Sequence, residues 1–178
     1  MTGFLRLAGI LNAAIWLGAS FLFTLAIYPA AFSDGMRQLL GPRNFPYFSE
    51  AIAQLFATRY YGLQIVCAGI ALLHLLAERL YLGHAPAKLR LSLLIVLFAL
   101  ALAGAAWIHP KLKLSHTVRH GVNTSPQDRQ AANETFLVWR PIFQIANVLT
   151  LGGVAIYAWR VANPSDPTRF LEAGKFRS

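Results

Sequence analysis

The stretch LSLLIVLFALALAGAAWI, residues 91–108, carries no charged side chain over 18 consecutive positions. A helix rises 1.5 Å per residue, so about 20 apolar residues are enough to cross the hydrocarbon core of a bilayer. An isolated strand would leave its backbone N–H and C=O groups unpaired in lipid, whereas a helix pairs them internally. Residues 91–108 therefore predict a membrane-spanning helix.

Three further apolar runs of similar length occur in the chain, at residues 7–32, 60–76 and 136–157. The first run is too long for the apolar core of a cleavable signal peptide, so we expect it to be retained. Aromatic and basic side chains stand at the ends of the runs, as anchors at a membrane–water interface do. These anchors are Arg59, Tyr60, Tyr61, Trp107, Trp139, Arg140, Tyr157 and Trp159.

The pattern predicts an all-α fold, an integral membrane four-helix bundle. We expect one domain over residues 1–164 and a polar tail over residues 165–178. Charged residues make up only 13% of the chain, against about a quarter in soluble domains. The net charge of +9 favours contact between basic loops and anionic lipid head groups. No basic face or aromatic platform remains outside the apolar runs, so no nucleic-acid partner is expected.

The connection between the first two runs, residues 34–58, has a helical pattern of its own. Asn44-Phe45-Pro46 is typical of a helix start. The apolar side chains that follow recur at helical spacing, namely Phe48, Ile52, Leu55 and Phe56. We expect an amphipathic interfacial helix lying on the membrane surface between the first and second spans. The alternative is one long helix through both segments. The third connection, residues 109–134 between the third and fourth runs, is expected to be polar and to lie outside the membrane.

Polar side chains inside the apolar runs share one face on three of the four predicted helices. The three sets are Asn12, Ser20 and Thr24 in the first run; Gln64, Cys67, His74 and Glu78 in the second; and Arg140, Gln144 and Asn147 in the fourth. In one interpretation they form interhelical hydrogen bonds, each worth about 0.6 kcal/mol. In the other they line a cavity for a small ligand or a proton. The packing interpretation is favoured, with Asn12, Gln64 and Asn147 pointing towards one another.

Three histidines, His109, His116 and His120, follow the third run. The four-residue spacing of the last two can place two metal ligands on one helical face. However, residues 111–122 contain no Asp, Glu or Cys, and their three basic side chains would repel a cation. We therefore expect interfacial histidines without a metal.

No cofactor is expected. A bis-histidine haem needs two histidines at one depth, but His74 and His109 lie at opposite ends of their runs, roughly 25 Å apart. Cu(I) prefers sulfur ligands, and the chain has one cysteine and two methionines. The sequence also lacks a Gly-rich phosphate loop, a His-Glu-x-x-His motif and a Gly-x-Ser-x-Gly motif. An enzyme is therefore not favoured.

Several short segments carry a family resemblance. They are residues 11–18 (LNAAIWLG) with Pro29, the second-run entry at residues 55–61, and Phe136, Trp139, Arg140 and Asn147 in the fourth run. With these, residues 4–160 resemble the four-span membrane proteins similar to transmembrane protein 205, known in bacteria as a domain of unknown function. The family often has a histidine near the start of the last span, where this chain has Arg140 and Phe143. The resemblance implies a four-helix membrane fold but no agreed activity.

Membrane orientation follows from charge. The 16 basic residues divide into eight on each side of the predicted spans. The short loop over residues 79–90 holds three of them, and short loops weigh most in the positive-inside rule. We expect a multi-pass protein of the bacterial inner membrane with both termini in the cytoplasm.

Three classes of function stay open. The favoured class is a non-enzymatic accessory or assembly subunit. Its third span, which carries five Ala and one Gly, would contact a second copy or a larger membrane complex. The second class is a small-molecule or ion-handling membrane protein that uses the intramembrane polar residues. The third is a metal or haem redox membrane protein.

Overall fold

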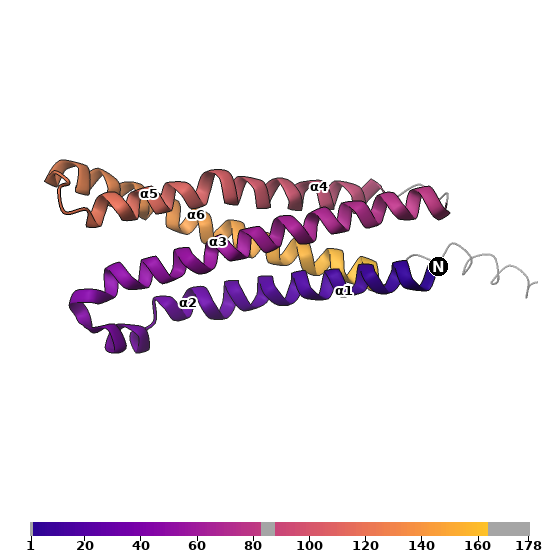
Figure 1. The fold of residues 1–178 in the computed structure, drawn as a ribbon, viewed down its shortest axis with the longest axis horizontal. Helices are drawn as coiled ribbons and strands as arrows, with labels where there is room; N and C mark the ends of the chain where they lie inside the picture. Colours follow the sequence, from indigo (N-terminus) through magenta and orange to yellow (C-terminus); the bar gives the residue numbers. More distant parts are fainter. Residues whose placement is uncertain (1, 83–87, 164–178) are drawn as a thin grey trace, which may run out of the picture.

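The computed structural model describes residues 2–82 and 88–163. Four helical rods lie side by side in it (Figure 1). The first rod is α1 (Thr2–Phe21), the π-helical segment η1 (Leu22–Ile27) and α2 (Tyr28–Ala31); the second is α3 (Asp34–Leu82); the third is α4 (Lys88–Ala103), the π-helical segment η2 (Gly104–Ile108) and α5 (His109–His120); the fourth is α6 (Pro126–Ala162). The described residues contain no strand, so the all-α fold class is confirmed.

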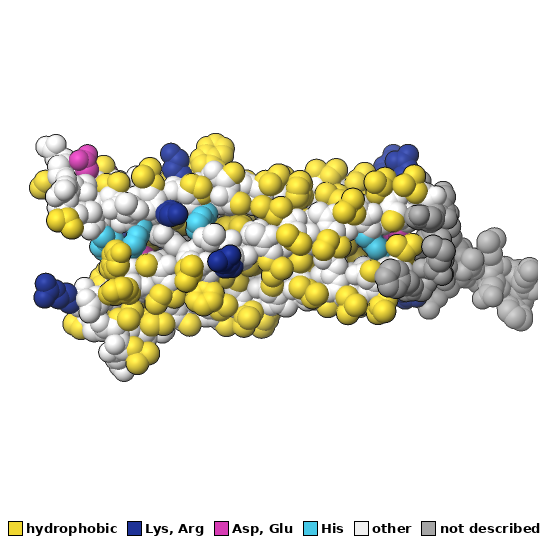
Figure 2. All heavy atoms as spheres, in the orientation of Figure 1, with side chains coloured by type: hydrophobic (Ala, Val, Ile, Leu, Met, Phe, Trp, Pro, Cys, Tyr) yellow, Lys and Arg dark blue, Asp and Glu magenta, His cyan; other side chains and the backbone are white. Residues whose placement is uncertain are grey.

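Each rod is long and apolar enough to cross a membrane, which confirms the four predicted spans. The longest segment of each rod without Lys, Arg, Asp or Glu spans residues 7–33, 60–77, 91–110 and 141–159, respectively. Figure 2 shows the corresponding band on one face of the molecule: right of centre, hydrophobic side chains cover a stretch without charged ones, and charged side chains lie on both sides of it. This band marks the level of the hydrocarbon core.

The rods form a closed ring in which α1 and α4 each pack against both α3 and α6. Two buried clusters fill the centre. The first surrounds Trp16, which is fully buried between α1, α3 and α6 and lies beside Tyr157. The second is largely aromatic and lies towards the other end, formed by Phe23, Tyr28, Ala31, Ala53, Ala57, Tyr60, Tyr61, Leu112, Phe136 and Phe143.

The prediction of a separate helix on the membrane surface is wrong, and the alternative of one long helix is what the structure shows. Helix α3 is interrupted only at Gly41, whose φ of 74° is in the left-handed region that glycine adopts without strain. Residues 42–82 then continue without a break. Glu50, Ala53 and Ala57 are buried because this face packs against α5 and α2. It is therefore not free to lie on lipid.

The third connection is also mostly helical. α5 directly continues the third span, and α6 begins at Pro126, so only residues 121–125 form a turn. The Ser125 side chain caps α6 by accepting a hydrogen bond from the Asp128 backbone N–H. Outside the apolar band, three helical segments thus continue the rods, with α5 packed against both α3 and α6; we call these segments, residues 42–58, α5 and residues 126–139, the extension.

Candidate functional site

The polar residues near the termini join α1 to α3. The Asn12 amide donates to the Cys67 carbonyl at 3.0 Å, and Gln64 accepts a hydrogen bond from the Trp16 indole. Gln64 also donates to the Ser20 hydroxyl at 3.0 Å. These bonds tie the two helices together inside the bundle and leave little polar capacity for a ligand.

His74 belongs to a second interhelical group at the same end. Its Nε2 lies 2.7 Å from the Leu5 carbonyl oxygen and must donate to it, which ties α3 to α1. Its Nδ1 lies 3.7 Å from Glu78, and Glu78 is paired with Arg90 of α4 at 2.7 Å. The partner of Glu78 is therefore on another helix rather than at the adjacent Arg79.

The polar residues of the fourth span lie elsewhere. The Arg140 guanidinium stacks over the Phe32 ring at 4.2 Å. Gln144 and Asn147 line a crevice of about 250 Å³ between η1 and α6. Asn147 is 3% exposed but bonds neither Asn12 nor Gln64. It lies at the depth of Phe23 and Thr24, and Thr24 is 12 residues, roughly 18 Å, along the rod from Asn12.

His109 bonds α3 at the other end of the apolar band from His74. Its Nε2 lies 3.3 Å from both the Gln54 carbonyl oxygen and the Thr58 hydroxyl. Gln54 precedes His74 by 20 residues on α3, which is about 30 Å of helix. His74 and His109 therefore lie at opposite ends of the bundle and cannot share one iron.

The structure instead brings Glu50 of α3 to His116 and His120 of α5. One carboxylate oxygen and one nitrogen from each imidazole all lie within 4.8 Å of one another. Glu50 and His116 are buried, at 6% and 7% exposure, and His120 is half-buried. We call these three residues the carboxylate–histidine cluster.

Hydrogen bonds orient two of the three members. His116 Nε2 lies 3.1 Å from the Tyr47 carbonyl oxygen. A carbonyl only accepts, so this nitrogen carries the proton and Nδ1 keeps the free lone pair. The Tyr47 ring stacks on the His116 imidazole at 5.0 Å. Arg119 donates to Oε1 of Glu50 at 2.9 Å, which fixes the plane of the carboxylate.

Two polar atoms of the cluster have no hydrogen-bond partner. Oε2 of Glu50 and Nε2 of His120 are both buried and unpaired in the described part of the chain, and they lie 3.7 Å apart. Buried polar atoms without partners are rare because desolvating them is costly. Burial, together with the neighbouring His116 and Arg119, lowers the pKa of His120, while the Glu50 carboxylate acts in the opposite direction. Its imidazole is therefore mostly neutral at pH 7.

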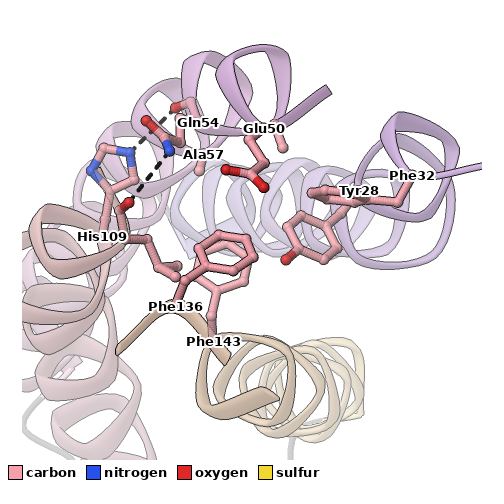
Figure 3. Close-up of a pocket in the computed structure, with 10 residues that line it drawn as sticks. Tyr28, Phe32, Glu50, Gln54, Ala57, His109, Phe136 and Phe143 are labelled. Carbon is pink, nitrogen blue, oxygen red and sulfur yellow. Dashed lines mark hydrogen bonds between the residues drawn. The ribbon is translucent and has the colours of Figure 1, made fainter. Parts of the chain in front are cut away.

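A small cavity of about 20 Å³ adjoins Glu50, enough for one water molecule. Figure 3 shows the Glu50 carboxylate at its edge, pointing towards Tyr28 and Phe136. Glu50 precedes Arg59 by nine residues on α3, and Arg59 marks the edge of the apolar band. The cluster therefore lies about 14 Å outside this band. Water and dissolved ions can reach it there.

The sequence pattern around the histidines does not predict Glu50 as their acidic partner, because residues 111–122 contain no Asp or Glu. Glu50 is 66 positions before His116 in the chain. A usable signal was nevertheless present: Glu50 shares a helical face with the small residues Ala53 and Ala57. A face with small side chains favours close helix packing, so an acidic side chain on it is placed against a neighbouring helix.

The fold and these sites define a multi-pass helical membrane protein with a polar cluster in its extension. The chain belongs to the family described as domain of unknown function (DUF4149), which it matches over residues 11–120. That match includes all three members of the carboxylate–histidine cluster, whereas α6 lies outside it. Searches of curated proteins and of solved structures gave no match.

Proposed function

We propose that this protein binds a divalent transition-metal ion, zinc in the first instance, through Glu50, His116 and His120. The observation that supports this proposal concerns two buried atoms, Oε2 of Glu50 and Nε2 of His120. Neither has a hydrogen-bond partner in the described part of the chain, and they lie 3.7 Å apart. This separation is too long for a hydrogen bond. It is shorter than twice the zinc–ligand distance of about 2.0–2.2 Å, so one ion can bond both atoms.

The donor set matches the chemistry of zinc. Two imidazole nitrogens and one carboxylate oxygen form a known three-ligand zinc set, with water in the fourth position. Metal-bound histidines usually donate their other N–H to a carbonyl or carboxylate, as His116 does to Tyr47. No sulfur atom belongs to the cluster, which disfavours Cu(I).

The positive charge of α5 is less of an obstacle than its sequence suggests. Lys111 lies on the side of α5 that faces α6, where it lines a groove between these two helices. Arg119 is paired with Glu50 and leaves the second carboxylate oxygen free. The charge of Arg119 still weakens binding of a dication, so we expect an affinity weaker than that of structural zinc sites with thiolate ligands.

Zinc titration of the purified chain tests the proposal. After treatment with a chelator, the protein in detergent should take up one zinc ion per chain, measured by calorimetry. Zinc at 100 times its Kd should raise stability by about 2.7 kcal/mol. Glu50→Gln and His120→Ala should abolish uptake, and His74→Ala, at the opposite end of the bundle, should not.

The variant His120→Ala guards against loss of folding, because His120 is only half-buried and its removal leaves the Arg119–Glu50 pair in place. Absence of saturable zinc uptake by the unmodified chain would contradict the proposal. Equal uptake by the unmodified chain and by both cluster variants would contradict it as well.

The role that we propose to go with such a site is that of a non-enzymatic accessory or assembly subunit, and the absence of redox chemistry at zinc argues only against a redox protein. The water position on zinc offers a place for a donor from a partner protein. In this proposal the chain is a DUF4149 member similar to the transmembrane protein 205 group, acting in a homo-oligomer or a larger membrane complex. Isolation in mild detergent with and without zinc tests this role: a partner or a second copy should remain bound only with zinc.

A further inference from the structure

The crevice between η1 and α6 has four side chains with hydrogen-bonding groups in the apolar band, namely Thr24, Tyr28, Gln144 and Asn147. It is lined by Phe23, Thr24, Leu25, Tyr28, Gln144, Asn147 and Val148 and has a volume of about 250 Å³. Leu25 and Val148 are more than half exposed, so the crevice opens sideways towards lipid. Counted from Arg140, Gln144 and Asn147 lie about 6 and 10 Å inside the band.

The Thr24 hydroxyl is unusual for a helical residue in this protein. Six other helical Ser and Thr side chains donate to the carbonyl four residues earlier, namely Ser20, Thr58, Ser115, Thr117, Thr135 and Thr150. Oγ1 of Thr24 is buried and makes no such bond in the described part of the chain; the protein group beside it is the Tyr60 hydroxyl. Thr24 lies within the π-helical segment η1, and π-helical turns occur often at functional sites.

The two carboxamides of α6 in the crevice differ in their surroundings. The side chain of Asn147 is 3% exposed and makes no hydrogen bond among the described residues. The Tyr61 hydroxyl lies beside it and is the nearest protein group that could bond it. Gln144 faces the bilayer and is likewise unbonded. Unsatisfied polar groups in hydrocarbon are costly, so a hydrogen-bonding occupant of the crevice would relieve a large penalty.

We infer that the crevice binds the head of a neutral bilayer lipid that carries hydroxyl and carbonyl oxygens, of the diacylglycerol type. Hydroxyls and carboxamides both donate and accept, so Thr24, Gln144 and Asn147 match such a head group. The lining contains no charged side chain. The Arg140 guanidinium lies beside Tyr28 of the lining, but it is stacked on Phe32, so a phosphate would have to displace it from that ring to be neutralised. The acyl chains would leave past Leu25 and Val148 into the bilayer.

This inference is independent of the metal proposal, because the crevice and the carboxylate–histidine cluster share no residue. Two lipids with the same acyl chains, dioleoylglycerol and dioleoylphosphatidic acid, separate a neutral from an anionic head. Native mass spectrometry of the full chain released from detergent micelles measures how much of each lipid is retained. We expect saturable retention of dioleoylglycerol and at least tenfold weaker retention of dioleoylphosphatidic acid.

Variants connect the retention to the crevice. Asn147→Leu should weaken retention of dioleoylglycerol about tenfold, as expected for a lost buried hydrogen bond. Gln144→Leu serves as a second variant that keeps the fold, because this side chain faces lipid and should weaken retention several-fold. Thr150→Val is the matched control on the same helix, since the Thr150 hydroxyl bonds Ala146 and lies outside the crevice; retention should stay unchanged. Equal retention of both lipids, or unchanged retention in both Asn147→Leu and Gln144→Leu, would overturn the inference.

Discussion

The ring of Tyr61 occupies the space where a side chain on Gly104 would be. A β-carbon at Gly104 would lie 2.1 Å from Cε1 of Tyr61 and 2.7 Å from its hydroxyl oxygen. Gly104 begins η2, and Tyr61 belongs to the buried aromatic cluster. The absence of a side chain at this position is therefore what allows the third span to approach α3 so closely.

Gly104→Ala should destabilise the protein by about 1–3 kcal/mol, because the Tyr61 ring is enclosed by other aromatic rings and cannot move aside freely. Reversible unfolding in mixed detergent micelles measures this change. Gly62→Ala is the matched control, since a β-carbon at Gly62 meets nothing within 4 Å. Alanine there should leave stability unchanged or raise it by up to about 1 kcal/mol. Equal effects of the two substitutions would show that the contact with Tyr61 does not limit packing.

Gln64 and Trp16 should be energetically coupled. Gln64→Leu leaves the fully buried indole N–H of Trp16 without an acceptor, and an unsatisfied buried donor costs about 1–3 kcal/mol. The double variant Trp16→Phe with Gln64→Leu replaces both partners by apolar groups. Its loss of stability should be smaller than the sum of the two single losses, as measured in a double-mutant cycle. Strict additivity would mean that the hydrogen bond contributes nothing.

Ser125→Ala should loosen the start of α6. The Ser125 hydroxyl accepts from the Asp128 N–H and donates to its carboxylate, and loss of such a cap costs about 1 kcal/mol. Amide hydrogen exchange at Asp128 should become faster. Thr135→Ala, farther along the same helix, should not change exchange at Asp128. Unchanged exchange in Ser125→Ala would mean that tertiary packing alone holds the first turn.

The orientation of the chain can be tested by cysteine labelling in a Cys67→Ala background. Four spans place Ser125, between α5 and α6, and Asn163, after α6, on opposite sides of the membrane. With both termini in the cytoplasm, a membrane-impermeant maleimide added to intact cells should label Ser125→Cys and not Asn163→Cys. The reverse pattern would invert the orientation only. Labelling of both cysteines from outside would contradict the four-span arrangement.

The four spans were predictable because a run of apolar residues long enough to cross lipid has few other uses. The continuation of these helices into the extension was not predictable, since the same amphipathic pattern in residues 44–58 suits a membrane surface and a helix bundle equally well. Only the packing partner distinguishes them. Here that partner is α5. Its polar sequence is equally typical of a loop, so the sequence did not indicate a helix there.

The candidate site was predictable only in part. His116 and His120 were recognised by their spacing, but the acidic member of the cluster depends on which residue of α3 lies opposite them. Once residues 42–58 are known to pack against α5, Glu50 comes level with His116 and His120. The expectation that Asn147 would meet Asn12 and Gln64 failed for a related reason: all three side chains are buried, but Asn147 lies at a different depth from Asn12, and Gln144, expected on the same face as Asn147, is exposed.

The unbroken helix over residues 42–82 also bears on hydrophobic mismatch. At 1.5 Å per residue it is about 60 Å long, roughly twice the thickness of a hydrocarbon core. Where a span ends in a loop, a thicker bilayer would place the unpaired backbone N–H and C=O groups of the loop in lipid, which is costly. The residues of α3 next to the band already have their backbone groups paired, Leu55 and Phe56 are exposed apolar side chains, and Arg59 can extend its charged end towards water. On this side, lipid can cover one more helical turn of α3 at small cost. Helix α3 therefore suits membranes of more than one thickness.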